Sequence, residues 1–182
     1  MPAGTTRNRK LVCLTGFMGS GKTTVGRLLA QQLGWMFVDL DTKIEERAGL
    51  SIPQIFERQG EPAFRELEYD VLKRSLGQIA EQKKAAVVAL GGGTITQPGS
   101  LELLRESGGL LVWLDCPVEE LLSRCATVTN RPLFRDEAGF RALYAQRRPL
   151  YEQADYRVLS TGEPRRVVEQ LLALELLEKV TA

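Results

Sequence analysis

The sequence predicts an α/β fold in which helices cover both faces of a parallel β-sheet. Short apolar segments alternate along the chain with longer segments whose apolar residues recur at helical spacing. The short segments are almost continuously apolar, which is typical of parallel strands buried on both faces. The first of them, LVCLT, is followed at once by the glycine-rich stretch GFMGSGKTT. Because such sheets bind ligands beyond the carboxyl ends of their strands, we expect the functional site there.

The individual elements follow from this alternation. Strands are expected over residues 11–15, 36–40, 85–90, 110–115 and 156–160. Helices are expected over 23–33, over about 42–82 with interruptions at Gly49 and Pro53, from about Val118, and from Pro164 onwards. Polar or glycine-rich residues end four of these strands, in GFMGSGKT, DLD, GGG and LDCP, so we expect these ends to share one edge of the sheet.

Composition limits the classes of function. The 182 residues fit one domain, residues 1–182. The formal net charge of +1 gives no general attraction to nucleic acid or membrane, and no segment approaches the ~18 apolar residues of a membrane span. The three cysteines form no CxxC pair, so we expect reduced core thiols in a cytoplasmic protein. Histidine is absent, which excludes mechanisms that need a histidine base, nucleophile or metal ligand.

The stretch GFMGSGKT matches the phosphate-binding pattern G-x-x-x-x-G-K-[ST] between an expected strand and an expected helix. Its glycines let backbone N–H groups face an anion, and the helix that follows adds its positive end. Lys22 would approach the β- and γ-phosphates, and the Thr23 hydroxyl would bind Mg²⁺. The predicted ligand is a nucleoside triphosphate with Mg²⁺, held by Gly19, Ser20, Gly21, Lys22, Thr23 and Thr24.

The other strand ends leave the reaction open, because the same loop serves kinases, GTPase switches and motor ATPases. In DLD, an extended chain would put Asp39 and Asp41 on one face. One carboxylate could then hold the water shell of a metal while the other accepts a hydrogen bond from a substrate hydroxyl. The alternative is a strand end with two solvated acids. In FRELE, Arg65 and Glu68 lie three residues apart, where a local ion pair is the alternative to a substrate contact. The glycines 91–93 either form a loose turn or let backbone approach a flat ligand.

A resemblance covers nearly the whole chain. Taken in order, GFMGSGKTTVGRLLA, FVDLD, IEERAGLSIPQIFERQGEPAFRELE, LGGGT, NRPLF and RRPLY resemble the shikimate kinase family, from about residue 11 to about residue 172. The family implies a three-layer P-loop kinase fold like that of nucleoside monophosphate kinases. Its parallel sheet has five strands in the order 2-3-1-4-5, with helices on both faces and a mobile lid. Family members transfer the γ-phosphoryl group of ATP to the 3-hydroxyl of shikimate, in aromatic amino-acid biosynthesis.

The matching motifs imply an acceptor site. Asp41 would bind the ring hydroxyls of shikimate and help to remove a proton, as a base or as a positioner. Arg65 and Arg147 would hold the shikimate carboxylate, which suits planar bidentate guanidinium groups. Within the triple glycine Gly91, Gly92 and Gly93, Gly92 would contact the substrate through its backbone. The substrate-binding helical region would cover about residues 42–70.

The resemblance also implies a nucleotide site. Lys22, Mg²⁺ and Arg131 would neutralise the charge that develops on the transferred phosphoryl group. Asp39 would lie near Mg²⁺ and contact it through water, beside Thr23. Arg124 and Pro164 would enclose the adenine between them.

Several expectations concern the surroundings of the site. The aperiodic segment from Cys125 to Gly139 predicts a lid over about residues 126–138. TGEPRR offers Arg165 or Arg166 as a further nucleotide contact, with no basis for choosing. The family implies a monomer. The alternatives are a kinase for a related small acid, such as aminoshikimate or gluconate, or a regulatory nucleotide-binding domain without turnover.

Overall fold

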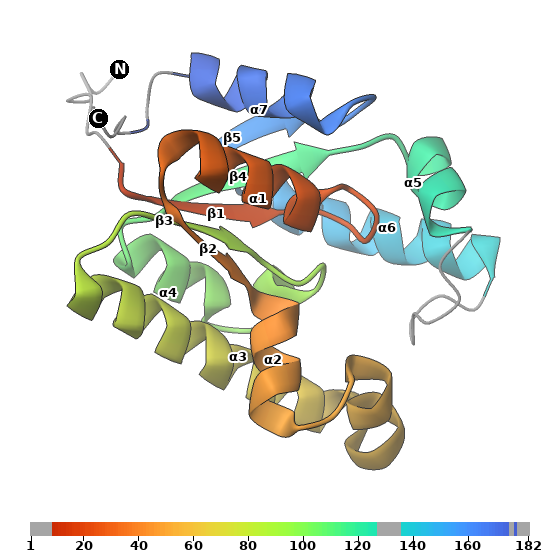
Figure 1. Cartoon of the computed structure of the whole chain (residues 1–182). Coiled ribbons are helices and arrows are strands. Elements are labelled where there is room, and N and C mark those ends of the chain that lie inside the picture. Colours follow the sequence, from red (N-terminus) through yellow and green to blue (C-terminus); the bar gives the residue numbers. More distant parts are fainter. Residues whose placement is uncertain (1–8, 127–135, 175–176, 178–182) are drawn as a thin grey trace.

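The computed structural model describes residues 9–126, 136–174 and 177. Within these residues, five strands form one sheet in the order β2-β3-β1-β4-β5 (Figure 1). The strands are β1 (Leu11–Thr15), β2 (Met36–Asp39), β3 (Ala86–Ala89), β4 (Leu110–Asp115) and β5 (Tyr156–Leu159). All neighbouring strands are parallel. The expected strands and the strand order implied by the resemblance are therefore confirmed.

Helices connect the strands and cover both faces of the sheet. They are α1 (Lys22–Leu33), α2 (Leu40–Ala48), α3 (Ile52–Gln82), α4 (Ser100–Glu106), α5 (Val118–Cys125), α6 (Glu137–Tyr151) and α7 (Pro164–Ala173), with a 3₁₀ helix η1 (Thr94–Thr96). The sequence had indicated neither η1 nor α4, because segments this short carry little periodic signal. None of the described helices combines the length and apolar character that crossing a membrane would require.

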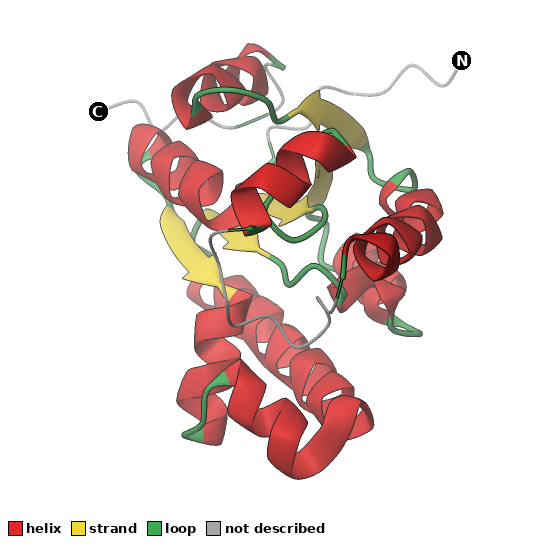
Figure 2. Ribbon diagram, turned by 90° about the vertical axis from the view of Figure 1, so that its right-hand side faces the viewer, coloured by secondary structure: helices red, strands yellow, loops and turns green. Residues whose placement is uncertain are grey.

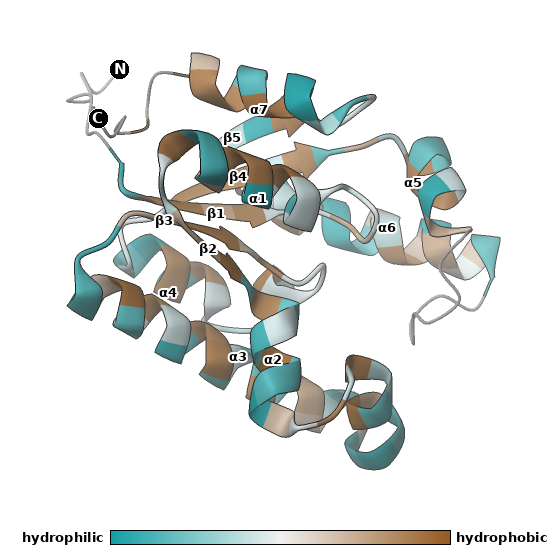
Figure 3. Cartoon of the chain, viewed as in Figure 1, coloured by the Kyte–Doolittle hydropathy of each residue, from teal (hydrophilic) through white to brown (hydrophobic). Residues whose placement is uncertain are grey.

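The sheet divides the core into two parts. On one face, Val12 and Leu14 of β1 pack in a cluster with residues of α1 and α7. On the other face, Leu11 and Cys13 pack in a cluster with residues of α3, α4 and α6. Because successive strand residues point to opposite faces, an uninterrupted apolar strand serves both clusters. The central strand β1 is accordingly hydrophobic along its length in Figure 3, whereas the edge strand β5 is partly hydrophilic.

The long helix α3 differs from the expectation. Gly49 ends α2 as predicted, but Pro53 does not interrupt a helix: it lies in the first turn of α3, where proline is favoured. The break occurs instead at Gly60, with φ 80° and ψ 172°, two residues before Pro62. Glycine adopts this conformation without the steric cost that a Cβ would bring. The part of α3 before the break projects with α2 away from the sheet (Figure 2).

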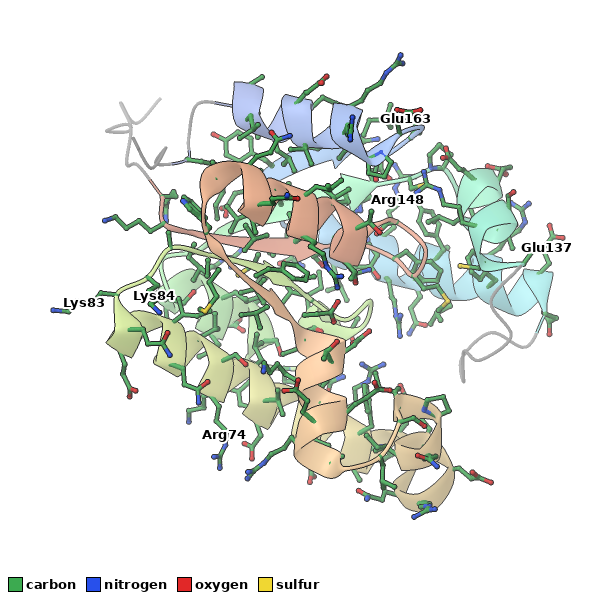
Figure 4. All side chains as sticks on the ribbon, viewed as in Figure 1. Arg74, Lys83, Lys84, Glu137, Arg148 and Glu163 are labelled. Carbon is green, nitrogen blue, oxygen red and sulfur yellow. The ribbon has the colours of Figure 1, made fainter. Side chains whose placement is uncertain are left out.

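The break in α3 has a packing consequence. It brings Phe56, before the break, against Phe64, after it, with ring centroids 4.6 Å apart. The later part of α3 lies along the sheet, with Leu72 and Leu76 buried and charged side chains such as Arg74 pointing outward (Figure 4). The kinked helix therefore carries an aromatic pair beyond the carboxyl edge of the sheet while remaining anchored to the core.

Candidate active site

The glycine-rich loop between β1 and α1 turns tightly around the start of that helix. Gly19 and Gly21 have positive φ angles of 81° and 89°, and a Cβ at Gly16 would lie 2.7 Å from the backbone oxygen of Leu114. The loop leads into the first turn of α1, whose N–H groups have no intrahelical acceptor. Backbone donors and the positive end of a helix thus meet at one place, which favours binding of an anion.

Lys22 folds back over this loop. Its Nζ donates hydrogen bonds of 2.8 and 2.9 Å to the carbonyl oxygens of Gly16 and Phe17. After β5, the Ser160 hydroxyl donates a bond of 2.7 Å to the carbonyl oxygen of Ser20. The Lys22 bonds close the loop on itself and keep the ammonium group beside the anion-binding turn, and the Ser160 bond ties the loop to the end of β5.

A cavity of about 500 Å³ lies next to the loop, beyond the carboxyl ends of the strands. The predicted nucleotide-binding residues that line it are Gly19, Gly21, Lys22, Thr23, Thr24, Asp39, Arg124 and Pro164. Ser20 does not line it and is buried beneath the loop. The cavity therefore gathers residues from the loop, α1, the end of β2, α5 and α7.

Oxygen ligands suited to Mg²⁺ face each other at this cavity. The Thr23 hydroxyl donates a hydrogen bond of 2.6 Å to Asp39 Oδ2, while Asp39 Oδ1 accepts one of 3.3 Å from the N–H of Thr42 and caps α2. Mg²⁺ takes hard oxygen ligands and usually keeps waters and phosphate oxygens in its shell. In the part of the chain that the structure describes, no three acidic, cysteine or histidine side chains cluster as a metal site. The residues fit Mg²⁺ held together with phosphate.

Arg124 ties α5 to the same cavity. Its Nη1 donates a bond of 3.1 Å to the carbonyl oxygen of Gly19, and its Nη2 donates one of 3.2 Å to the carbonyl oxygen of Ser160. An ion pair with Glu120, one turn earlier in α5, orients the guanidinium group. Arg124 and Pro164, predicted as an adenine-binding pair, thus do line one cavity.

A second cavity, of about 110 Å³, adjoins the first. Met18, Asp41 and Gly92 line both cavities, so these residues mark where the two meet. The residues that line only the second cavity come mainly from α3, α6 and the triple glycine, and they are Ile52, Phe56, Phe64, Arg65, Glu68, Gly91, Gly93 and Arg147. An apolar wall thus faces a group of charged side chains, as in sites for small polar rings.

Arg65 is held in this second cavity by carboxylates. Its Nη1 lies 2.7 Å from Glu68 Oε2, and its Nη2 lies 3.2 Å from Glu61 Oε1. The side chains of Arg65 and Glu68 are only 9% and 1% exposed, whereas that of Glu61 is half exposed. The ion pair between Arg65 and Glu68, which the spacing offered as the alternative to a substrate contact, therefore forms, and it forms inside the candidate site.

The triple glycine lies against these charges. A Cβ at Gly91 would lie 2.6 Å from Glu68 Oε1 and 3.0 Å from Asp41 Oδ1, and a Cβ at Gly93 would lie 2.5 Å from Arg65 Nη1. Such distances are too short for non-bonded atoms. Any other residue at these two positions would displace the carboxylates or the guanidinium group, so the glycines allow close backbone approach.

Arg147 of α6 brings a second guanidinium group to the cavity. The pKa of Arg147 is lowered, mainly by burial. The positive charge of Arg65 also lowers this pKa, while Tyr151 acts in the opposite direction. Tyr151 itself is fully buried and donates a hydrogen bond of 2.5 Å to the carbonyl oxygen of Gly92. Two arginines that repel each other at one small cavity favour an anionic ligand between them.

Comparison with known proteins agrees with this geometry. Residues 18–176 match the family model described as shikimate kinase. The chain belongs to the shikimate kinase family. A shikimate kinase of Parasynechococcus marenigrum is 49% identical over 166 residues, which cover 88% of this chain and 83% of that protein.

Solved shikimate kinases share the fold. A shikimate kinase from Acinetobacter baumannii, solved in complex with shikimate, superposes with a TM-score of 0.84 at 41% identity, over 91% of this chain and 92% of that one. A shikimate kinase from Aquifex aeolicus gives a TM-score of 0.75 at 40% identity, over 90% of this chain and 95% of that one. The P-loop kinase fold that the resemblance implied is therefore confirmed.

The structure corrects one expectation drawn from the spacing of the two acids in DLD. Asp39 and Asp41 do not share the face of an extended chain, because β2 ends at Asp39 and Asp41 lies in the first turn of α2. Both nevertheless line the larger cavity. The helix that Asp39 caps turns Asp41 toward the smaller cavity as well, which two residues of a strand would not achieve.

Some residues of the site were not predicted, and others lie outside the structure. Tyr151, Ser160 and Thr94 contact the site through hydroxyl groups, but the sequence assigned no role to them: Thr94 ends the motif LGGGT, Tyr151 ends RRPLY, and Ser160 belongs to no motif. A place within or near a motif was the only signal for these hydroxyl side chains, and such residues are common. Arg131 and most of the expected lid fall in residues 127–135, outside the described residues.

Proposed function

We propose that this chain transfers the γ-phosphoryl group of ATP to the 3-hydroxyl of shikimate, giving ADP and shikimate 3-phosphate. The observation that carries the proposal is the meeting of two cavities at Asp41 and Gly92. One cavity is built on the phosphate-binding loop, and the other contains two arginines and an apolar wall. The two cavities would thereby hold the γ-phosphoryl group of the donor next to a hydroxyl of the carboxylate-bearing ring, as direct transfer of the phosphoryl group requires.

On the acceptor side, Arg65 and Arg147 bind the carboxylate of shikimate. Planar guanidinium groups match a carboxylate, and their mutual repulsion is relieved when the anion lies between them. The apolar residues Ile52, Phe56 and Phe64 line the same cavity and pack against the carbon ring. Backbone of the triple glycine approaches the ring closely because no Cβ intervenes.

Asp41 lies at the junction and therefore next to the hydroxyl that reacts. Its carboxylate accepts a hydrogen bond from this hydroxyl, orients the oxygen toward the phosphoryl group and takes up the proton as the new P–O bond forms. Phosphoryl transfer depends mainly on positioning and charge, so orientation is the larger part of this role.

On the nucleotide side, the loop N–H groups and the start of α1 bind the phosphates through Gly19, Ser20, Gly21, Lys22, Thr23 and Thr24. Lys22 places its ammonium group on the β- and γ-phosphates. Thr23 would hold Mg²⁺ directly and Asp39 would hold it through water, and the ion would supply positive charge next to the phosphates. Arg124 and Pro164 hold the adenine.

Further parts of the proposal rest on the sequence. Residues 126–138 form a lid that brings Arg131 to the phosphates and excludes water. Hydrogen exchange tests the lid: protection over 126–138 should increase with an ATP analogue and shikimate, and equal exchange with and without these ligands contradicts it.

Residues 1–182 form one domain with its core over 10–172, which acts as a cytoplasmic monomer without nucleic-acid or membrane partners.

Release of ADP tests the function directly. The chain is incubated with Mg·ATP and shikimate, quinate, gluconate, AMP or no acceptor, and the products are analysed by mass. We expect ADP and a singly phosphorylated product with shikimate alone. Turnover with gluconate but not shikimate would assign the second cavity to another acid, and ATP binding without turnover on any acceptor would indicate a regulatory domain.

A further inference from the structure

A buried hydroxyl to which no motif assigns a role is linked to Arg65, the arginine of the proposed acceptor site. Thr94, the first residue of η1, is completely buried, and its hydroxyl donates a hydrogen bond of 2.7 Å to Glu68 Oε1. The other oxygen of the same carboxylate, Oε2, accepts a bond of 2.7 Å from Arg65 Nη1. A continuous chain of hydrogen bonds therefore runs from Thr94 through Glu68 to Arg65.

The two bonds on Glu68 have different origins. Arg65 and Glu68 are three residues apart on α3, so helix geometry alone brings them together. Thr94 is 26 residues from Glu68 and comes from another element, so that contact depends on the fold. Among the described residues, Thr94 and Arg65 are the hydrogen-bond donors to the Glu68 carboxylate, one on each oxygen.

Burial of the Glu68 carboxylate makes the hydrogen bond from Thr94 important for its orientation. The Glu68 side chain is 1% exposed, so water cannot replace a lost donor easily. A buried carboxylate oxygen without a donor is costly, and the carboxylate would rotate to recover a bond. Rotation of the Glu68 carboxylate would carry the Arg65 guanidinium group with it, because Nη1 is bonded to Oε2. The Thr94 hydroxyl thus opposes the movement that would misalign Arg65.

The close packing around Gly91 further limits how the Glu68 carboxylate can be oriented. Glu68 Oε1, Asp41 Oδ1 and Thr94 Oγ1 would lie 2.6, 3.0 and 3.0 Å from a Cβ at residue 91. Two carboxylates therefore approach the same point, and the hydroxyl of Thr94 supplies a neutral donor there. A β-branched side chain has a restricted χ1, so threonine holds this donor in one direction.

We infer that Thr94 is a positioning residue for the acceptor: through Glu68, it holds the Arg65 guanidinium group in the orientation that binds the carboxylate of shikimate. The inference rests on the proposed function, since it assumes that Arg65 binds this carboxylate. Thr94 touches neither substrate in this assignment, and it acts on acceptor affinity rather than on the phosphoryl transfer itself.

Kinetics of three variants test the inference. Thr94→Val keeps the shape and removes the donor, Thr94→Ser keeps the donor, and Ser100→Ala removes a buried hydroxyl that has no partner in the described structure. For Thr94→Val we expect a rise of about tenfold or more in the KM for shikimate, with the KM for ATP and kcat within about threefold. Thr94→Ser should restore the KM for shikimate, and Ser100→Ala should leave it unchanged.

A double-mutant cycle with Glu68→Gln gives an independent readout. If Thr94 acts through Glu68, the effects of Thr94→Val and Glu68→Gln on the KM for shikimate should be clearly less than additive. Thr94→Ala, which adds no bulk, takes the place of Thr94→Val if the valine variant does not fold, and it is expected to show the same selective rise in the KM for shikimate.

The outcomes separate this inference from the proposed function. Wild-type chain that releases no ADP with shikimate overturns the proposed function and, with it, the role of Thr94. Wild-type turnover with an unchanged KM for shikimate in Thr94→Val overturns the positioning role alone. An equal rise in the KM for both substrates in Thr94→Val, together with a lowered Tm, also overturns the positioning role, because a general packing defect then explains the effect of the substitution.

Discussion

The hydroxyl of Thr23 lies 2.6 Å from a carboxylate oxygen of Asp39, although the strands that precede these residues are not neighbours. β3 lies between β1 and β2 in the sheet. Thr23, in the first turn of α1, therefore reaches past the end of β3 to Asp39, the last residue of β2. The glycine-rich loop and the end of β2 meet only because the chain skips one strand position between β1 and β2.

Asp39→Asn should weaken the response to Mg²⁺. Asparagine also caps helices well, so α2 should keep its start at residue 40. In the proposed site, the change removes the negative charge that would orient a water of Mg²⁺, and loss of such an outer contact costs about 10–100-fold in metal affinity or activity. A titration of activity against Mg²⁺ at saturating ATP measures it. Asp70→Asn, at an exposed position of α3, is the matched control, and equal Mg²⁺ dependence in both variants would contradict the assignment.

Arg65→Ala should raise the KM for shikimate far more than the KM for ATP. The change removes one partner of a desolvated charged contact, a loss on the order of 2–5 kcal/mol. It also leaves Glu68 buried without its arginine, so a lowered Tm is expected alongside. Initial rates with each substrate varied in turn check the prediction. Arg74→Ala, on the outer side of the same helix, is the control and should change neither KM (Figure 4). An unaltered KM for shikimate in Arg65→Ala would show that Arg65 has a structural role only.

Gly91→Ala and Gly77→Ala should have opposite effects. A Cβ at Gly91 would press on the carboxylates of Glu68 and Asp41, whereas a Cβ at Gly77 would meet no atom within 4 Å. We expect Gly91→Ala to destabilise by about 1–3 kcal/mol and to weaken shikimate binding. Gly77→Ala, in the interior of α3, should stabilise by about 0.5–1 kcal/mol. Urea unfolding and calorimetric titration with shikimate measure both, and a well-folded Gly91→Ala with normal affinity would show that the close approach is unimportant.

The free energy of unfolding should fall as the pH rises above about 9. Burial raises the pKa of the Cys13 thiol from 9.0 to about 12, and burial raises that of Cys116 to about 11. A raised pKa means that the folded state holds the proton more tightly. Its stabilising contribution is therefore complete below pH 9 and is lost progressively between pH 9 and about 12.

Cys13→Ala isolates one part of this pH dependence. The variant should unfold more easily at pH 8, since a buried side chain is truncated, but its stability should decline less steeply between pH 9 and 11. Cys116 keeps part of the slope in the variant. Urea unfolding at several pH values gives the comparison, and identical slopes for wild type and variant would refute the contribution of Cys13.

Sequence patterns predicted the frame of the molecule because their signals are local. Continuous apolar segments identified the strands, and a motif of eight residues identified the loop before α1. The resemblance supplied the strand order and named Arg65 and Arg147, which the structure places at one cavity. The break at Gly60 was not predicted, because a glycine two residues before a proline is equally compatible with the end of a helix.

The sequence by itself determined which segments are buried and which chemical groups the chain offers, since hydrophobicity and motif spacing belong to the residues. Only the tertiary structure decided how those groups meet. Thr94 reaches Glu68 from another element, Tyr151 reaches Gly92 from α6, and Asp41 turns on a helix rather than a strand. Such contacts join residues that are distant in sequence, and their geometry follows from the packing of whole elements on the sheet.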